Sequence, residues 1–306
     1  MVSDWSFVSV DMELTNSCLC DCLICPREAI VRPTGFMTEE TFDTLSDKLV
    51  REGSLITFSG MGDPLFHPMV FDWIKSVRLN GGAIGIVVNP TSLHGHNSRK
   101  LVDARPNSIT LSFPSLQKKI FEQLCPNISF PVALSRSMEL IGLARGDVGL
   151  RIQGVLTDRN RGETEHFVSY WKGLGVPSSM VACHGRGGNL RKPGIYTPES
   201  LEIFSGRCGL FSLHTFVTWE GEVLSCCHDL TGSTRIGTLI TEDVSLIAER
   251  KQGLNKKDSL PFSVCRQCDE PLRRCVLPQG SPPVGKKERN RFFREVSRSG
   301  RVFKNV

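Results

Sequence analysis

The sequence lacks any apolar run approaching the roughly 18 residues that a membrane-spanning helix requires. The stretch from Met1 to Trp5 also lacks the charged and apolar zones of a signal peptide. These two absences argue against a membrane protein and against an exported one. We therefore expect a cytoplasmic protein, in which clustered cysteines indicate metal binding or catalysis more often than disulfide bonds.

Cysteine is scarce in the middle of the chain, where only Cys125 and Cys183 lie between residues 26 and 207. The remaining cysteines of the twelve form two sets. The first set is Cys18, Cys20, Cys22 and Cys25, and the second is Cys208, Cys226, Cys227, Cys265, Cys268 and Cys275. Two sets of soft ligands separated by a long cysteine-poor stretch predict two separate metal sites.

Excess positive charge is nearly absent outside the C-terminal end. The net charge is +5, and residues 286–306 alone carry eight basic and two acidic residues. A basic tail of this kind can bind nucleic acid or an acidic peptide, although a solvated terminus is its more common role. Because the rest of the chain is close to neutral, we do not expect nucleic acid to be a partner of the folded core.

Strands and helices alternate from residue 7 to residue 183. Apolar runs and alternating patterns predict strands at 7–14, 55–58, 83–88, 108–112, 148–156 and 179–183. Helical spacing predicts helices at 38–49, 70–77, 116–124, 135–144 and 163–174. This order predicts an α/β fold with a parallel sheet. Six βα units are too few for a closed eight-stranded barrel, so we expect a partial (β/α)6 barrel with its chemistry at the C-terminal ends of the strands.

The pattern changes after Pro198. Residues 216–219 and 222–225 flank Glu220-Gly221 and predict a β-hairpin, followed by a short helix at 245–251 and a polar loop at 255–261. A segment this small and this rich in cysteine needs additional stabilisation, such as a bound metal, in order to fold. We therefore expect a core over 1–200, a cysteine-rich domain over 201–280 and a basic tail over 281–306.

The first motif is Cys18-x3-Cys22-x2-Cys25, in the loop that follows the first strand. Three thiolates can hold three irons of a [4Fe–4S] cluster and leave the fourth iron open. A triplet of Cys20, Cys22 and Cys25 and a zinc knuckle are the alternatives. The spacing and the preceding run from Glu13 to Cys18 resemble the radical S-adenosylmethionine (SAM) superfamily. That resemblance implies that the open iron binds SAM, which is cleaved to a 5′-deoxyadenosyl radical after an external donor of the flavodoxin or ferredoxin type supplies one electron.

Further positions extend the resemblance in the same order of strands. Gly60, Met61, Gly62 and Asp63 match a Gly-Gly-Glu-Pro-like element that contacts the methionine amino group of SAM, with aspartate where glutamate is usual. The resemblance also implies cofactor contacts for Ile24, Asn89, Ser112 and Arg151. For the last three, an ordinary turn or surface role is an equally good interpretation.

The loop after the sixth strand carries the candidate catalytic residues Cys183, His184 and Arg186. Cys183 could return a hydrogen atom to a substrate radical, although a lone cysteine is more often a small buried side chain. His184 and Arg186 could assist proton removal or hold a ligand, and a plain flexible loop is the alternative.

The second cysteine set resembles the SPASM or shorter twitch domains that follow many radical SAM cores. The resemblance implies one auxiliary [4Fe–4S] cluster on Cys208, Cys226, Cys265 and Cys268, with Cys227 or Cys275 as possible replacements. A zinc-binding interaction module would explain these cysteines but not the βα series.

The sequence does not identify the substrate. Because the first strand begins by Phe7, we expect no N-terminal leader-binding domain. We therefore favour oxidation of a small aminocyclitol or sugar-type metabolite. Epimerisation through a cysteine hydrogen donor and modification of a peptide are the alternatives.

Overall fold

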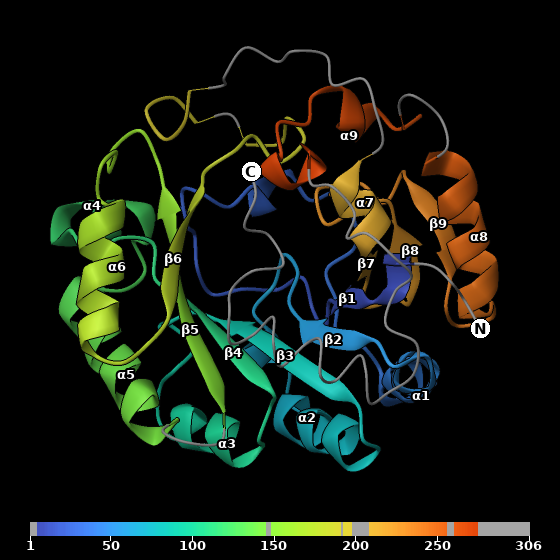
Figure 1. Ribbon diagram of the computed structural model, residues 1–306, viewed down its shortest axis with the longest axis horizontal. Coiled ribbons are helices and arrows are strands. Elements are labelled where there is room, and N and C mark those ends of the chain that lie inside the picture. The colour runs from blue at the N-terminus through green and yellow to red at the C-terminus, as the bar shows by residue number, and fades with distance from the viewer. Residues whose placement is uncertain (1–4, 145–147, 191, 198–207, 256–259, 275–306) are drawn as a thin grey trace.

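The computed structural model describes residues 5–144, 148–190, 192–197, 208–255 and 260–274. Within them, one nine-stranded sheet runs in the order β6-β5-β4-β3-β2-β1-β7-β8-β9, with helices along its outer side (Figure 1). The strands are β1 (Ser9–Met12), β2 (Leu55–Phe58), β3 (Ala83–Val88), β4 (Ser108–Ser112), β5 (Gly149–Leu156), β6 (Ser178–Ala182), β7 (His214–Val217), β8 (Glu222–Leu224) and β9 (Arg235–Thr238).

Helices connect and flank these strands, and most of them bury an apolar face. They are α1 (Glu39–Glu52), α2 (Val70–Leu79), α3 (Asn97–Asp103), α4 (Lys118–Leu124), α5 (Phe130–Leu143), α6 (Thr164–Gly173), α7 (Gly209–Leu213), α8 (Val244–Asn255) and α9 (Ser263–Arg266). Helix α1 begins as predicted, because the Thr38 side chain accepts a hydrogen bond from the backbone N–H of Thr41.

The two faces of the sheet differ in polarity. Val10, Met12, Ile56 and Phe58 are fully buried in the core on the helix side. The alternate positions on β1, β2 and β4 are only half-buried, and they include Ser9, Asp11, Thr57, Ser108 and Thr110. Since side chains alternate across a strand, these polar residues face the inner side of the curved sheet.

The predicted α/β fold with a parallel sheet is confirmed, because β1 to β6 pair in parallel with their neighbours. Some element predictions were wrong. Helix α5 begins at Phe130, five residues earlier than 135, with Pro131 in its first turn. Helix α3 was not predicted, and α8 continues to Asn255, where a loop was expected.

The predicted hairpin is present and also joins the main sheet. Strands β7 and β8 pair antiparallel, and the turn uses Gly221 at a φ of 81°. Strand β7 also pairs in parallel with β1, with Ser9 opposite His214. The sheet is therefore continuous from the core into the cysteine-rich segment. The predicted boundary at residue 200 and the tail over 281–306 lie outside the described residues.

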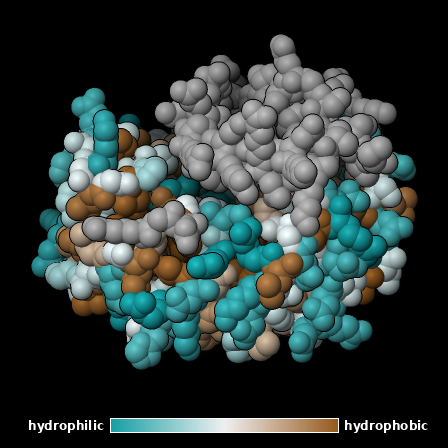
Figure 2. Space-filling model, turned by 60° about the horizontal axis from the view of Figure 1, so that its bottom comes forward, coloured by the Kyte–Doolittle hydropathy of each residue, from teal (hydrophilic) through white to brown (hydrophobic). Residues whose placement is uncertain are grey.

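The outer surface is of mixed polarity. On the face in Figure 2, hydrophilic side chains are spread over the described part and are interrupted by smaller hydrophobic groups. Among the described residues, no helix has both the length and the apolar character needed to cross a membrane.

Candidate functional site

The first cysteine set lies in the loop that leaves the C-terminal end of β1. Cys18, Cys22 and Cys25 are half-buried, and the backbone N–H of Cys25 donates to the carbonyl of Cys22 at 3.0 Å. Burial raises the pKa of Cys25, and the neighbouring Cys18 adds to that rise. The three thiols therefore share one neighbourhood, and three sulfurs in one short loop suit iron.

Cys20 is placed differently from its three neighbours. It is buried, and its Sγ donates to Oδ1 of Asn89 at 3.4 Å. Side-chain hydrogen bonds also couple the Cys20 thiol to those of Cys18 and Cys22, so its sulfur lies beside theirs. The preference for the triplet of Cys18, Cys22 and Cys25 over the one that contains Cys20 therefore rests on its spacing, which resembles the radical SAM motif.

The loop of Gly60, Met61, Gly62 and Asp63 packs directly against the cysteine loop. A Cβ on Gly62 would lie 2.1 Å from the carbonyl oxygen of Thr15, so only glycine fits there. Gly60 has a φ of 132° and lies against the Glu13 side chain. Sequence reasoning singled out this loop as a SAM contact, and the structure brings it to the cysteines.

Asp63 and Asn89 join two neighbouring strand ends. The backbone N–H of Asp63 donates to the carbonyl of Ser17 at 2.9 Å. The Oδ2 atom of Asp63 accepts a hydrogen bond from Nδ2 of Asn89 at 2.9 Å, and the Oδ1 atom of Asp63 accepts one from the backbone N–H of Leu65. Burial raises the pKa of the Asp63 carboxyl. Since both oxygens are already engaged, Asp63 braces the loop that carries it.

A buried ion pair behind this loop was not predicted. The two terminal guanidinium nitrogens of Arg32 contact the Glu13 carboxylate, at 2.8 and 3.1 Å, and both side chains are shielded from solvent. Glu13 Oε1 also accepts from the backbone N–H of Met61 at 3.2 Å. Glu13 was noted only as part of the cysteine motif, and nothing in the local pattern pointed to Arg32.

The remaining predicted cofactor residues lie around the same end of the sheet. Ile24 is half-buried against the core, and Ser112 ends β4 opposite Gln153 of β5. Arg151 lies on β5, where Nη2 donates to Oε1 of Gln153 at 2.9 Å. Burial lowers the pKa of Arg151 from its usual value.

The second cysteine set also comes together. Burial raises the pKa of Cys226, and the charges of Cys227, Cys265 and Cys268 raise it further. Cys208 acts in turn on both Cys265 and Cys268. Cys227 instead lies within electrostatic range of Asp11 and Arg186. The four expected ligands are thus linked through Cys265 and Cys268, Cys227 adjoins Cys226, and Cys275 lies outside the described residues.

Two side chains, those of Arg273 and Asp229, fix the backbone around these cysteines. Nη1 of Arg273 donates to the carbonyls of Cys265 and Cys268, at 2.6 and 3.1 Å. Asp229, three residues after Cys226, accepts from the backbone N–H groups of Thr231, Gly232 and Thr234. Although burial opposes it, these bonds keep the pKa of Asp229 below its usual value.

The loop of His184 and Arg186 contacts the second cysteine set. Glu270 Oε2 lies 3.0 Å from Nε2 of both His184 and His228, and the three residues each offer a possible metal-ligand atom within 4.8 Å of the others. Because Nδ1 of His184 accepts from the backbone N–H of Arg186, neutral His184 carries its proton on Nε2 and donates it to Glu270. This is a hydrogen-bonded bridge between two rings, and Glu270 was not predicted.

Arg186 holds an uncommon backbone conformation, with a φ of 52°. Burial raises the pKa values of Cys25, Cys183 and Cys227, and the positive charge of Arg186 opposes that rise at each of them. Arg186 therefore lies within electrostatic range of both cysteine sets. Cys183 follows β6 and packs against the core, with its pKa raised to about 11.

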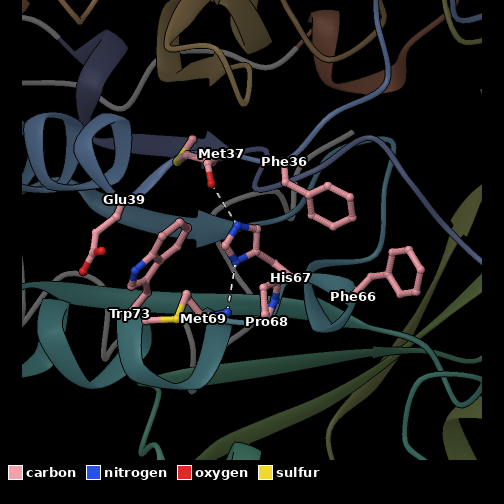
Figure 3. A pocket seen from close by; sticks show the side chains of 8 residues that line it. All are labelled: Phe36, Met37, Glu39, Phe66, His67, Pro68, Met69 and Trp73. Atoms are coloured by element: carbon pink, nitrogen blue, oxygen red, sulfur yellow. Dashed lines mark hydrogen bonds between the residues drawn. The ribbon is translucent and has the colours of Figure 1, made fainter.

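A shallow apolar groove lies beside the loop of Gly60 to Asp63 (Figure 3). It is lined by Phe36, Met37, Glu39, Phe66, His67, Pro68, Met69 and Trp73. Nε2 of His67 contacts the Met37 carbonyl, and Nδ1 accepts from the backbone N–H of Met69. Burial lowers the pKa of His67. The ring therefore serves to fix the segment after Asp63.

Comparison with known proteins agrees with this geometry. The sequence model described as the Radical SAM superfamily matches residues 12–146. A curated protein of Pyrococcus furiosus, a tungsten-containing aldehyde ferredoxin oxidoreductase cofactor-modifying protein, is 24% identical over 179 residues. The match covers 56% of this chain and 50% of that protein, so it spans half the length of the relative.

Solved structures share the fold at low sequence identity. BtrN in complex with AdoMet and 2-DOIA superposes with a TM-score of 0.57 at 15% identity, over 88% of this chain and 95% of that one. Streptococcus suis SuiB bound to precursor peptide SuiA gives 0.64 at 10% identity, over 87% and 71%. anSMEcpe with bound AdoMet gives 0.62 at 14% identity, over 81% and 83%.

Proposed function

Residues 12–146 match the radical SAM superfamily, and from that premise we propose that this chain binds SAM on a [4Fe–4S] cluster held by Cys18, Cys22 and Cys25. The observation that carries the proposal is the contact between two loops. The three-thiol loop after β1 packs against the glycine-rich loop after β2, where Gly62 permits the close approach. Three sulfurs and an adjacent backbone surface suit a cluster with one open iron.

A second [4Fe–4S] cluster is proposed on Cys208, Cys226, Cys265 and Cys268, whose four thiols complete the coordination of one cluster. When bound, the first cluster with SAM supplies a 5′-deoxyadenosyl radical, and the second supplies a one-electron donor or acceptor. The initial electron comes from an external donor of the flavodoxin or ferredoxin type.

The chain's own residues are proposed to position SAM and the substrate and to assist proton removal. Gly60 and Met61 present backbone to SAM, and Arg151 and Ser112 are proposed for its polar groups. His184 is proposed to assist proton removal from the substrate once its Nδ1 gives up the hydrogen bond from the backbone N–H of Arg186, and its ring is held by Glu270 beside the second cysteine set. Arg186 is proposed to hold the substrate in the same space. Such positioning is the main contribution of a protein whose cofactor performs the difficult chemistry.

We propose that the substrate is a small aminocyclitol or sugar-type metabolite and that it is oxidised. The likeness to BtrN, whose structure holds 2-DOIA and which matches over nearly its whole length, supports a small molecule. The second candidate is a peptide, supported by the likeness to SuiB with its precursor peptide and to anSMEcpe with a Kp18Cys peptide.

Epimerisation is the competing reaction, because Cys183 is half-buried beside His184. A hydrogen-atom donor must keep its S–H, and burial favours the protonated form of this thiol by raising its pKa to about 11. Its contacts are also those of a packing residue, and we therefore favour oxidation.

The test is to incubate the reconstituted, reduced protein and SAM in deuterated water. The probes are streptamine, glucosamine and short peptides. Oxidation of a small molecule predicts a product about two mass units lighter than its substrate, with one 5′-deoxyadenosine formed per product. A product with solvent deuterium on the reacting carbon and no change in oxidation level would overturn the dehydrogenase proposal. Loss of that deuterium in Cys183→Ala would then identify the donor.

A further inference from the structure

The middle of the cysteine loop is held by a segment far along the chain. The backbone N–H of Asp21 donates to Oδ1 of Asn127 at 2.7 Å. The backbone N–H of Leu23 donates to the carbonyl of Leu124 at 2.9 Å. Between these two bonds, Sγ of Cys22 lies 3.5 Å from Sγ of Cys125. Two backbone donors thus fix the loop on both sides of a contact between two sulfurs.

Cys125 is itself held in place. It caps the C-terminus of α4, where its backbone N–H donates to the carbonyl of Phe121 at 2.8 Å. It is buried within the core, and α4 buries Ile120, Phe121 and Leu124 around it. Because a packed helix fixes the backbone of Cys125 and its side chain is buried, the fold determines the position of its sulfur beside Cys22.

The chemistry of the two sulfurs assigns the direction of this contact. A thiol S–H is a weak donor and a cysteine sulfur a weak acceptor. A sulfur bound to iron has lost its proton, so in a protein with Cys22 on iron only Cys125 can donate. Hydrogen bonds to cluster sulfurs belong to the features that set the reduction potential of an iron–sulfur cluster.

We propose that Cys125 is a positioning residue that donates its S–H to the sulfur of Cys22 and so raises the reduction potential of the first cluster. The inference rests on the proposed cluster on Cys18, Cys22 and Cys25. A donor directed at the ligand sulfur stabilises the reduced cluster, because that form carries more negative charge. Cys125 thereby helps the cluster accept the electron that SAM cleavage requires.

The test compares Cys125→Val, Cys125→Ala and Cys125→Ser after anaerobic reconstitution. Valine keeps most of the buried volume and removes the donor, whereas serine keeps a donor. The first cluster is identified by the electron paramagnetic resonance signal that changes when SAM is added, and its midpoint potential is read by redox titration. We expect all three variants to keep the iron of the unmodified protein. The midpoint potential should fall in Cys125→Val and Cys125→Ala, and in Cys125→Ser it should stay near that of the unmodified protein.

Each other outcome has a separate meaning. Equal potentials in all four proteins would overturn the proposed hydrogen bond. Loss of the SAM-sensitive signal in all three variants, with the unmodified protein retaining it, would show that Cys125 is a ligand and overturn its positioning role. Absence of that signal from the unmodified protein would instead contradict the proposed function on which the inference rests.

Discussion

Glu13 and Arg32 lie 19 residues apart and form an ion pair that is shielded from solvent beneath the glycine-rich loop. Removing one partner of such a pair leaves a buried charge without compensation, which costs about 3–5 kcal/mol. The pair also receives the backbone N–H of Met61, so its loss disturbs the surface proposed to contact SAM.

Arg32→Met is therefore expected to lower the free energy of unfolding by about 3–5 kcal/mol. Arg51→Met is the matched control, because Arg51 pairs with Asp47 on the exposed side of α1. An exposed pair contributes only about 0–1 kcal/mol. Urea unfolding followed by circular dichroism measures the free energy of unfolding of both variants. Equal losses in the two variants would contradict the importance given to the buried pair.

Sequence reasoning found residues whose spacing is local and missed residues that meet only in the fold. Cys18, Cys22 and Cys25 are recognisable because they lie in one loop. Cys125 is 103 residues from Cys22 and carries no motif of its own. Glu270 likewise meets His184 only because the two loops fold together.

At the scale of elements, apolar runs located β2, β3 and β4 with the bounds that the structure has. Each is a short strand with a buried face, which gives a clear pattern. Helix α3 has seven residues and no side-chain cap, so the local signal was weak. The start of α5 was missed because Pro131 looks like a break, although proline is favoured in the first turn of a helix.

The loop after β2 gives a sharp prediction at this scale. Gly62→Ala places a Cβ 2.1 Å from the Thr15 carbonyl oxygen, so the glycine-rich loop must move away from the cysteine loop. We expect SAM affinity to fall at least about tenfold, which corresponds to about 1.4 kcal/mol. Isothermal titration with SAM measures this. Gly142→Ala in α5 is the control, because a Cβ there meets nothing within 4 Å.

In that control, SAM binding should be unchanged, and stability should rise slightly because alanine favours a helix more than glycine does. Wild-type SAM affinity in Gly62→Ala would show that the contact between the two loops does not shape the cofactor site.

At the scale of the whole molecule, β1 is an inner strand with β2 on one side and β7 on the other. The sequence predicted two consecutive domains, and it could not show this pairing because parallel neighbours far apart along the chain leave no local pattern. The loop that leaves β1 carries the first cysteine set, while β7 leads into the hairpin of the second. The two sites are thus supported by one sheet.

A chain cut after residue 207 is therefore expected to aggregate and to lose the first cluster as well. The cut exposes the edge of β1, and an exposed strand edge promotes association. The control is full-length protein with Cys265→Ser and Cys268→Ser, which keeps β7 and should lose only the second cluster. Size-exclusion chromatography and iron analysis compare them. A monomeric truncated protein with about four irons would mean that the core is independent.

The central claim is tested most directly by 5′-deoxyadenosine formation in the reconstituted, reduced protein. The unmodified protein should cleave SAM slowly without any substrate and contain about eight irons, as two [4Fe–4S] clusters require. Cys18→Ala, Cys22→Ala and Cys25→Ala should each abolish cleavage. Cys20→Ala should retain it, because Cys20 lies outside the triplet whose spacing resembles the radical SAM motif. Cleavage by Cys18→Ala together with none by Cys20→Ala would contradict the assigned triplet, and no cleavage by the iron-loaded unmodified protein would contradict the account itself.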